Sequence, residues 1–363
     1  MCDADENLSR GTRNGGTDSD APATPAFAAS RRSLLKTTVA LGGAAFTAGA
    51  LGQTTVASAQ AAAATPSGDR LVMLGVGGGP VVAPGQAKPA LALVANGRVY
   101  LIDAGLDTTR QLVASGLGFG DVKHVFITHQ HLDHTSGLPD LVLHGWAGGR
   151  PPLTSLDLWG PPGMSRKIAG IRTTFGEDIN LFTAGGIIPV FPALKAHDVS
   201  LSATRRITRV MEDDNVAVDA TRVFHGPEVK DAYAYRFTLK HTSKTVVFSG
   251  DTAAPDQNLI ALAQGCDVLV HEAQDNTAVD RVAASYPPAQ GEALRKHLYR
   301  SHSDVLDLPA VAKAARAKKL VLNHYTPVVH PAATWLAIIR PAAEKAGYTG
   351  QILAPMDLDT ITL

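Results

Sequence analysis

The chain has 363 residues, 45% of them apolar, which is enough to bury the core of at least one sizeable domain. Its 33 basic side chains balance its 33 acidic ones. This balance gives no electrostatic reason for a polyanionic partner, so we expect no nucleic acid to bind. Only two cysteines are present, which excludes a scaffold held together by several disulfides.

The N-terminal residues predict export. Residues 1–30 are polar and lack apolar periodicity, so we expect a disordered extension. Residues 31–59 begin with Arg31-Arg32, continue into an apolar stretch interrupted by glycines, and end in Ala57-Ser58-Ala59. This order is typical of a bacterial twin-arginine signal peptide cleaved near Ala59, and the stretch is too weakly hydrophobic for a good membrane span. We therefore expect the twin-arginine export machinery as a partner and a periplasmic or secreted protein.

We expect residues 60–69 to be a linker and residues 70–363 to form one α/β domain. The glycine run at residues 74–80 lacks the Lys and Ser/Thr of a phosphate-binding loop, so we interpret it as a tight turn. Within residues 91–102, apolar segments flank Asn96-Gly97, which predicts a hairpin with a type I′ turn. Later predicted strands alternate with helical stretches at residues 257–263, 308–317 and 332–346.

Metal-ligating side chains are concentrated directly after the apolar segment 122–127, a predicted buried strand. His129, His131, Asp133 and His134 fall within six residues, although the whole chain has only 13 histidines. On extended backbone His129 and His131 point the same way and can hold one ion. Asp133 and His134 continue round a turn and can face a second ion. Imidazole and carboxylate ligands together suit Zn²⁺, with Mn²⁺ and Fe²⁺ as weaker possibilities.

Further chemistry-bearing residues occur where later apolar segments end. They are His225, Asp251, Glu272 and His324, together with His302 in the segment Ser301-His302-Ser303. Taken singly, a histidine at a strand end is more often an ordinary loop residue than a ligand. The interpretation as ligands gains weight because these residues recur at the ends of successive predicted strands.

Together these motifs resemble those of the metallo-β-lactamase-fold metallohydrolases, from about Leu71 to the end of the chain. The run at 129–134 resembles the family's His-x-His-x-Asp-His signature, and residues 100–105 resemble its Leu-Ile-Asp-Ala-Gly strand end. Residues 137–141 and 159–163 are similar to the branch that contains zinc arylsulfatases and ribonuclease Z. The resemblance implies an α/β fold: a four-layer αββα sandwich whose metal ligands lie at one edge.

The resemblance also implies roles for the individual residues of a site with two Zn²⁺ ions. The catalytic residues would be Asp133, also a ligand, and His302, which would protonate the leaving group or stabilise the oxyanion. Glu272 would orient a ligand imidazole from outside the metal shell. Water held between the ions would be deprotonated near neutral pH and attack the substrate. The implied ligands are His129, His131 and His225 for one ion, Asp133, His134 and His324 for the other, and Asp251 between them.

The implied activity is hydrolysis of small esters, with aryl sulfates and phosphodiesters as the leading classes. A cyclic-nucleotide phosphodiesterase is an alternative, because residues 131–134 resemble that class's signature as well. A ribonuclease Z-like nuclease fits less well, because export separates it from tRNA and residues 164–224 lack a clearly basic arm. A lactonase or β-lactamase, and a non-catalytic metal-binding protein, are further alternatives, the last disfavoured by the complete ligand set. By analogy with this fold, the protein could form a homodimer.

Overall fold

The computed structural model describes residues 68–202, 206–327 and 329–363. The predicted N-terminal extension (1–30), the signal peptide (31–59) and nearly all of the linker (60–69) therefore lie outside the described residues. None of the helices in the described ranges combines the length and the apolar character that crossing a membrane requires.

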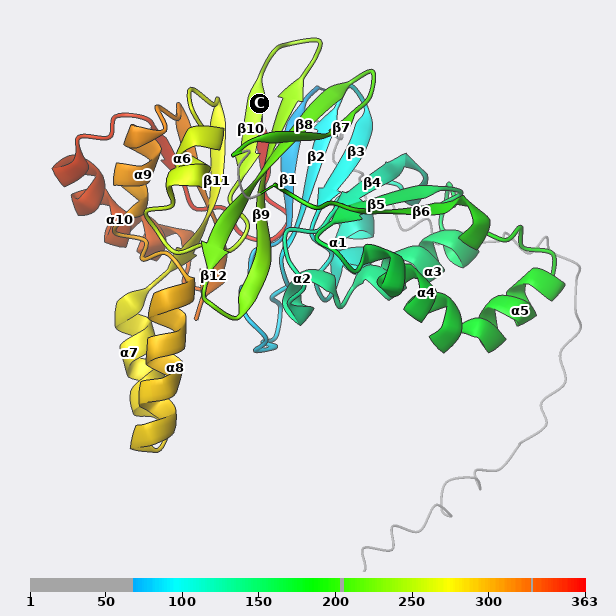
Figure 1. Cartoon of the computed structure of the whole chain (residues 1–363), viewed down its shortest axis with the longest axis horizontal. Helices are drawn as coiled ribbons and strands as arrows, with labels where there is room; N and C mark the ends of the chain where they lie inside the picture. Colours follow the sequence, from blue (N-terminus) through cyan, green and yellow to red (C-terminus); the bar gives the residue numbers. More distant parts are fainter. Residues whose placement is uncertain (1–67, 203–205, 328) are drawn as a thin grey trace, which may run out of the picture. The chain divides into compact units, whose positions relative to one another are not determined.

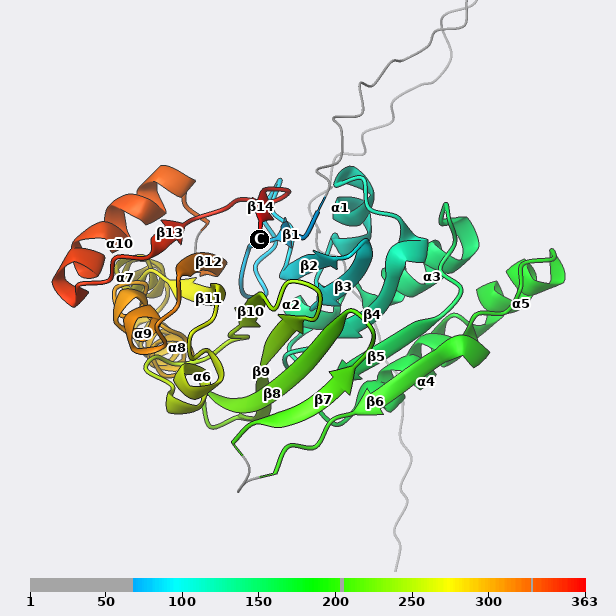
Figure 2. The same ribbon diagram turned by 90° about the horizontal axis from the view of Figure 1, so that it is seen from above.

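Two mixed seven-stranded sheets pack against each other (Figures 1 and 2). In hydrogen-bonding order, the first sheet contains β14 (Thr360–Thr362), β1 (Arg70–Gly75), β2 (Ala90–Ala95), β3 (Arg98–Ile102), β4 (Val122–Phe126), β5 (Leu156–Gly160) and β6 (Leu194–Asp198). The second contains β13 (Gln351–Leu353), β12 (Lys319–Thr326), β11 (Val268–Gln274), β10 (Thr245–Phe248), β9 (Val229–Leu239), β8 (Val216–His225) and β7 (Thr208–Glu212).

The β2–β3 hairpin has the predicted turn. β2 and β3 pair in antiparallel register, with Ala95 opposite Arg98. Asn96 and Gly97 both have positive φ, 47° and 78°, as the two central residues of a type I′ turn require. Asparagine and glycine adopt this left-handed conformation most easily, so the local sequence was sufficient to predict the turn.

Aromatic side chains fill the space between the two sheets. Phe126 of the first sheet meets Phe237 and Tyr235 of the second, with ring centroids 5.1 and 5.5 Å apart in edge-to-face geometry. All three rings are fully buried, and such pairs add about 0.5–1.5 kcal/mol to the free energy gained from burial alone. Tyr235 also donates a hydrogen bond of 2.9 Å to the carbonyl of Ile127. This bond fixes the end of β4 immediately before the histidine-rich segment.

Helices cover both outer faces, which confirms the four-layer αββα sandwich. Buried residues of α1, α3 and α4 pack on the first sheet, and those of α6, α9 and α10 on the second. The predicted helical stretches correspond to α6, α9 and α10. The bounds are α1 (Thr108–Ala114), α2 (Leu132–Thr135), α3 (Leu138–Gly148), α4 (Met164–Thr174), α5 (Gly176–Ala184), α6 (Gln257–Leu262), α7 (Asn276–Ala284), α8 (Pro288–Ser301), α9 (Leu308–Ala314) and α10 (Ala332–Ala346), with 3₁₀ turns η1 (Phe119–Asp121) and η2 (Phe191–Ala193). Helices α7 and α8 form a hairpin that projects from the sandwich (Figure 1).

Candidate metal centre

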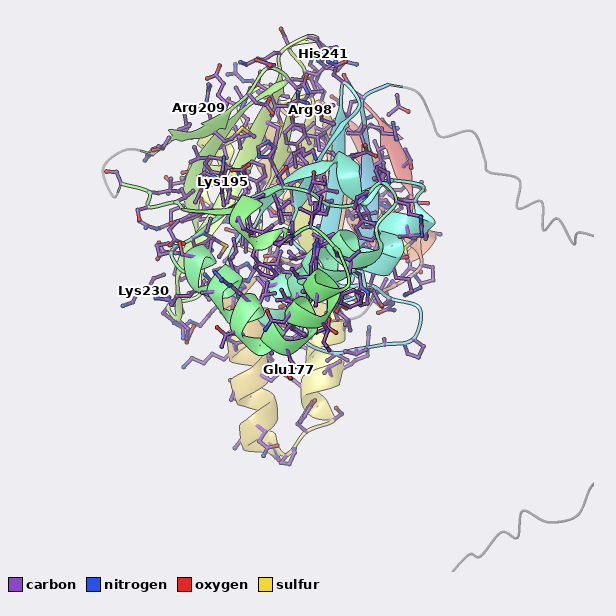
Figure 3. The ribbon with its side chains drawn as sticks, turned by 90° about the vertical axis from the view of Figure 1, so that its right-hand side faces the viewer. Arg98, Glu177, Lys195, Arg209, Lys230 and His241 are labelled. Atoms are coloured by element: carbon purple, nitrogen blue, oxygen red, sulfur yellow. The ribbon has the colours of Figure 1, made fainter. Side chains whose placement is uncertain are left out.

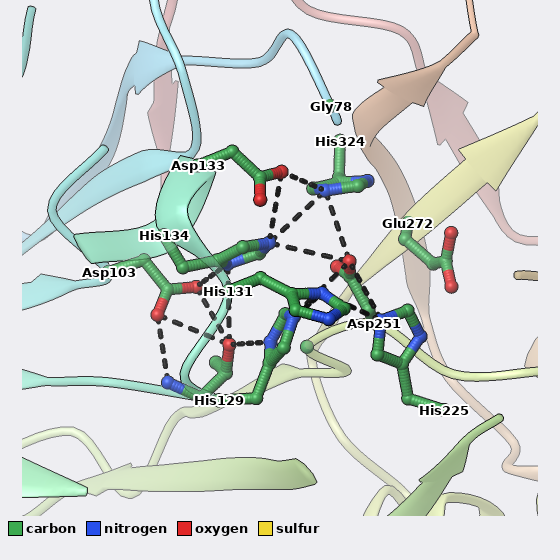
Figure 4. Close-up of polar contacts among 12 residues, drawn as sticks. Gly78, Asp103, His129, His131, Asp133, His134, His225, Asp251, Glu272 and His324 are labelled. Atoms are coloured by element: carbon green, nitrogen blue, oxygen red, sulfur yellow. Dashed lines mark hydrogen bonds and ion pairs between the residues drawn. The ribbon is translucent and has the colours of Figure 1, made fainter. Parts of the chain in front are cut away.

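The strands that carry the candidate ligands run in the same direction. In the second sheet β10, β11 and β12 are parallel, and two antiparallel pairings make β8 parallel to β10. In Figure 3, Arg98 at the start of β3 and His241 in the turn before β10 lie at one end of the sheets, and Lys230 lies at the other. β3 and β10, and with them β4 and β8, therefore direct their carboxyl ends to one edge. Side chains far apart in the sequence meet there (Figure 4).

The first group of candidate ligands consists of three imidazoles. The Nδ1 atom of His131 lies 2.9 Å from Nε2 of His129 and 3.2 Å from Nε2 of His225. The other ring nitrogen of His225, Nδ1, lies 2.7 Å from the carbonyl oxygen of Ser301. A carbonyl can only accept, so Nδ1 carries the proton and Nε2 presents a lone pair to the group.

The second group combines two imidazoles with a carboxylate. Nε2 of His134 lies 3.2 Å from Nε2 of His324, and Oδ2 of Asp133 lies 3.5 and 3.3 Å from these two nitrogens. Nδ1 of His134 donates to Oδ2 of Asp103 over 2.8 Å. Nε2 of His134 is therefore also available as a ligand, and Asp103 sets the orientation of the ring.

Asp251 lies between the two groups. Its Oδ2 is 3.1 Å from Nε2 of His324 and 3.3 Å from Nε2 of His134 in the second group. The same oxygen is 3.8 Å from Nε2 of both His129 and His225 in the first group. Its other oxygen, Oδ1, is buried and has no hydrogen-bond partner among the described residues. A buried, unsatisfied carboxylate oxygen beside converging lone pairs is costly unless a cation is bound.

The titration of the imidazoles also fits a site for cations. Burial lowers the pKa of His225 to about 3 and holds the pKa of His129 well below its usual value, so both rings are neutral, as ligation requires. Burial also disfavours the charged form of His134, but the surrounding carboxylates, Asp251 first, raise its pKa well above the usual value. This part of the centre therefore favours positive charge, which a bound metal can supply. The residues present fit a metal site, and the groups His129–His131–His225 and Asp133–His134–His324 each bring three ligand atoms within 4.8 Å of one another.

His302 lies beside the metal centre but is held by a carboxylate. Its Nδ1 donates to Oε2 of Glu272 over 2.8 Å, and its ring centroid is 4.9 Å from that of His225. Burial lowers the pKa of His302, but Glu272 more than offsets this, and the pKa rises to about 9. Glu272 thus holds the predicted catalytic histidine, and its predicted role in orienting a ligand imidazole stays a prediction. The sequence did not reveal this pairing because His302 follows α8, 30 residues further along the chain.

All nine predicted site residues thus lie in or beside this centre. The geometry brings the seven candidate ligands together, while their roles as ligands stay predictions. Asp103 was not singled out from the sequence. Its Oδ1 accepts from the backbone N–H of Thr128 at 2.8 Å, so one carboxylate fixes both the start of the histidine segment and the ring of His134. The signal was present, because Asp103 ends an apolar strand in the motif Leu-Ile-Asp-Ala-Gly.

Gly78 is a second residue whose contribution the sequence did not show. The run at 74–80 does turn the chain after β1, with Gly79 at a φ of +70°. A Cβ atom at Gly78, however, would lie 2.5 Å from Nδ1 of His324 and 2.5 Å from Oγ1 of Thr326. The backbone N–H of Gly78 donates to the carbonyl of Tyr325 at 3.1 Å. Glycine is therefore required here because the β1 loop packs directly on the ring of a candidate ligand.

Sequence and structure comparisons agree with this geometry. A ribonuclease Z of Mycobacterium sp. (strain KMS) is 28% identical over 270 residues, covering 74% of this chain and 88% of that protein. The crystal structure of human tRNase Z, short form, superposes with a TM-score of 0.57 at 21% identity, covering 81% of this chain and 98% of the other. Zn²⁺-bound PqqB from Methylobacterium extorquens superposes with a TM-score of 0.52 at 15% identity, covering 81% and 100%.

These relatives contradict the expectation that nucleic acid plays no part. The expectation used the net charge of the whole chain, whereas a ribonuclease Z acts on RNA. A balanced total can hide a local excess of basic side chains. Lys167 of α4 donates to Oγ1 of Thr135, next to His134, over 3.3 Å, and Arg300 lies two residues before His302. Cations therefore occur near the candidate ligands in a chain whose formal net charge is zero.

The model of one family, the beta-lactamase superfamily domain, matches residues 98–325, more than half of the chain. The matched segment contains every candidate ligand, His302 and Glu272. The fold, the order of the motifs along the strands and the converging side chains all agree with this match. The chain therefore belongs to the β-lactamase superfamily of metal-dependent hydrolases.

Proposed function

We propose that this protein is a binuclear zinc hydrolase that cleaves phosphodiester bonds, with RNA among its substrates. The observation that carries the proposal is the shared carboxylate of Asp251, which faces two groups of three ligand atoms at once. The imidazole and carboxylate set suits Zn²⁺, and a structural neighbour with this fold is zinc-bound. The names of the ribonuclease Z relatives favour phosphodiesters over aryl sulfates as the substrate.

When bound, paired Zn²⁺ ions in such a centre supply a nucleophilic water near neutral pH and neutralise charge on the substrate's oxygens. Water adds across the ester: its oxygen bonds to phosphorus, and the bond from phosphorus to the leaving oxygen breaks. His302 is placed to give the leaving oxygen its proton from Nε2, because Nδ1 is engaged by Glu272. Glu272 then stabilises the proton that His302 retains on Nδ1. Asp133, a buried candidate ligand of the second group, would orient the attacking water, which releases a proton to solvent as its oxygen bonds to phosphorus.

A panel of substrates tests this proposal directly. The zinc-loaded protein should hydrolyse bis-p-nitrophenyl phosphate and a tRNA precursor with a 3′ extension, and Asp251→Ala should be inactive on both. p-Nitrophenyl sulfate, p-nitrophenyl acetate and cyclic AMP serve as comparison substrates that represent the alternatives. Preferential turnover of the sulfate or the acetate would overturn the phosphodiester assignment, and turnover of cyclic AMP alone would replace RNA by a cyclic nucleotide.

We further propose that the protein is exported by the twin-arginine route. The support is the order Arg31-Arg32, apolar stretch, Ala57-Ser58-Ala59. Changing the arginine pair to Lys-Lys keeps the charge but removes the guanidinium groups that the machinery reads. A precursor should then accumulate in the cytoplasm, as detected by its mass in fractionated cells. Unchanged delivery of mature protein outside the cytoplasm would contradict export by this route.

A further inference from the structure

A recess of about 240 Å³ lies next to the metal centre, between the β8–β9 turn and one face of α8. Its lining includes three basic side chains, Lys296, His297 and Arg300. One carboxylate, that of Glu228, also faces it. The complete lining is Pro227, Glu228, Ala293, Lys296, His297, Arg300 and Ser301.

Both walls of this recess are continuous with residues of the metal centre. One wall begins two residues after His225, the last residue of β8. The other wall ends at Ser301, whose carbonyl oxygen accepts the hydrogen bond from His225 and whose next residue is His302. A molecule bound at the metal centre would therefore need only a short extension to reach the recess.

The two strongest cations of the recess have no ion-pair partner within the part of the chain that the structure describes. Lys296 and Arg300 are exposed and form no ion pair with any described residue, whereas Arg295 pairs with Glu292 at 2.5 Å and Asp280 at 3.9 Å. The spacing of Lys296 and Arg300 places both on the face of α8 that lines the recess. A cation in the last turn also stabilises a helix, which is sufficient to explain Arg300. Lys296 lies about 7.5 Å before Ser301 along the helix axis, beyond the reach of that effect.

We propose that the α8 recess is an anion subsite that binds a second phosphate of the substrate, one unit away from the phosphodiester at the metal centre. This inference rests on the proposed function. Lysine and arginine are the usual phosphate ligands, and Glu228 weakens the subsite by repulsion. A nucleotide with phosphates at both 3′ and 5′ positions has the required chemistry. So does a single strand of nucleic acid that continues past the scissile bond.

Two chromogenic substrates that differ by one phosphate test the subsite. They are the p-nitrophenyl ester of thymidine 5′-phosphate and the same ester with an added 3′-phosphate. The double variant Lys296→Ala/Arg300→Ala should raise KM for the bisphosphate about tenfold more than for the monophosphate, a difference of about 1.4 kcal/mol, because both side chains are exposed and water screens their charge. kcat should hold. Arg295→Ala removes a cation from another face of the same helix. It should leave KM unchanged for both substrates.

Glu228→Gln should have the opposite effect on KM. Removing the carboxylate should lower KM for the bisphosphate. Calorimetric binding of thymidine 3′,5′-bisphosphate and thymidine 5′-phosphate adds a readout that needs no turnover. The double variant should lose the extra affinity for the bisphosphate. Equal effects on both ligands, or no effect on either, would overturn the subsite.

The failure of the subsite can be told apart from the failure of the proposed function. If the wild type binds the bisphosphate more tightly but hydrolyses neither ester, the proposed function fails while the subsite stands. Inhibition by oligothymidylate far exceeding that by the bisphosphate identifies a nucleic-acid strand as the source of the phosphate.

Discussion

The two sheets contribute to the metal centre in different ways. The first sheet supplies four candidate ligands from one short segment after β4: His129 and His131 precede α2, and Asp133 and His134 lie within it. The second supplies His225, Asp251 and His324 from three separate strands, each residue within three positions of its strand's carboxyl end. Each group of ligands nevertheless contains side chains from both sheets. The local run therefore supplies ligand types, whereas the packing of the two sheets assembles the ligands into groups.

The strongest way to break this assembly is Asp251→Ala. Asp251 belongs to the second sheet, yet its Oδ2 faces imidazoles of both groups. We expect the reconstituted protein to fall from about two ions per chain to close to none and to lose activity to background. Elemental analysis after gel filtration measures this. Asp133→Ala is the matched control from the first sheet and should remove only one ion. Retention of both ions by Asp251→Ala would contradict the prediction that Asp251 is a ligand shared by both ions.

A large effect on turnover, without loss of metal, should come from His302→Ala. This residue touches the predicted ligands but is held by Glu272. If it protonates the leaving group, kcat should fall on the order of a hundredfold or more. The loss should be greater for alkyl phosphodiesters than for p-nitrophenyl esters, whose leaving group needs little protonation. A uniform loss together with a lower melting temperature would show that His302 only braces the loop.

Gly78→Ala tests whether the first sheet positions a ligand of the second. The added methyl group would overlap the ring of His324, so this candidate ligand must move. We expect metal affinity to fall about ten- to a hundredfold, the range seen when a residue that positions a ligand is lost. Gly170→Ala is the control, because beyond the neighbouring backbone of α4 no atom lies within 4 Å of a Cβ there. Unchanged zinc binding by Gly78→Ala would show that the β1 loop tolerates the displacement.

The same contrast explains how much the sequence could predict. Local patterns in the sequence were enough to predict three features, because each depends only on neighbouring residues. These are the β4 strand, the 129–134 cluster and the Asn96-Gly97 turn. The four-layer fold and the remaining candidate ligands followed from resemblance. The packing of Gly78 on His324 and the bond from Asp103 to His134 depend on segments that meet only after the sheets pack. The clustering of unpaired cations on α8 was hidden for the same reason, because the net charge contains no spatial information.

The smallest expected effects come from two buried carboxylates, one from each sheet, that perform the same task on different imidazoles. Asp103 accepts from Nδ1 of His134 and Glu272 from Nδ1 of His302, both at 2.8 Å. Asp103→Asn should weaken metal binding about tenfold, because His134 is a candidate ligand whose ring orientation and basicity depend on that carboxylate. Glu272→Gln should leave zinc affinity within about twofold and lower kcat, because His302 would no longer be held charged. Two measurements on both variants separate these roles. They are a zinc titration against a competing chelator and kcat at saturating zinc. If Glu272→Gln loses zinc as readily as Asp103→Asn, then His302 belongs to the metal shell, and the segment after α8 supplies a ligand in addition to those from the two sheets.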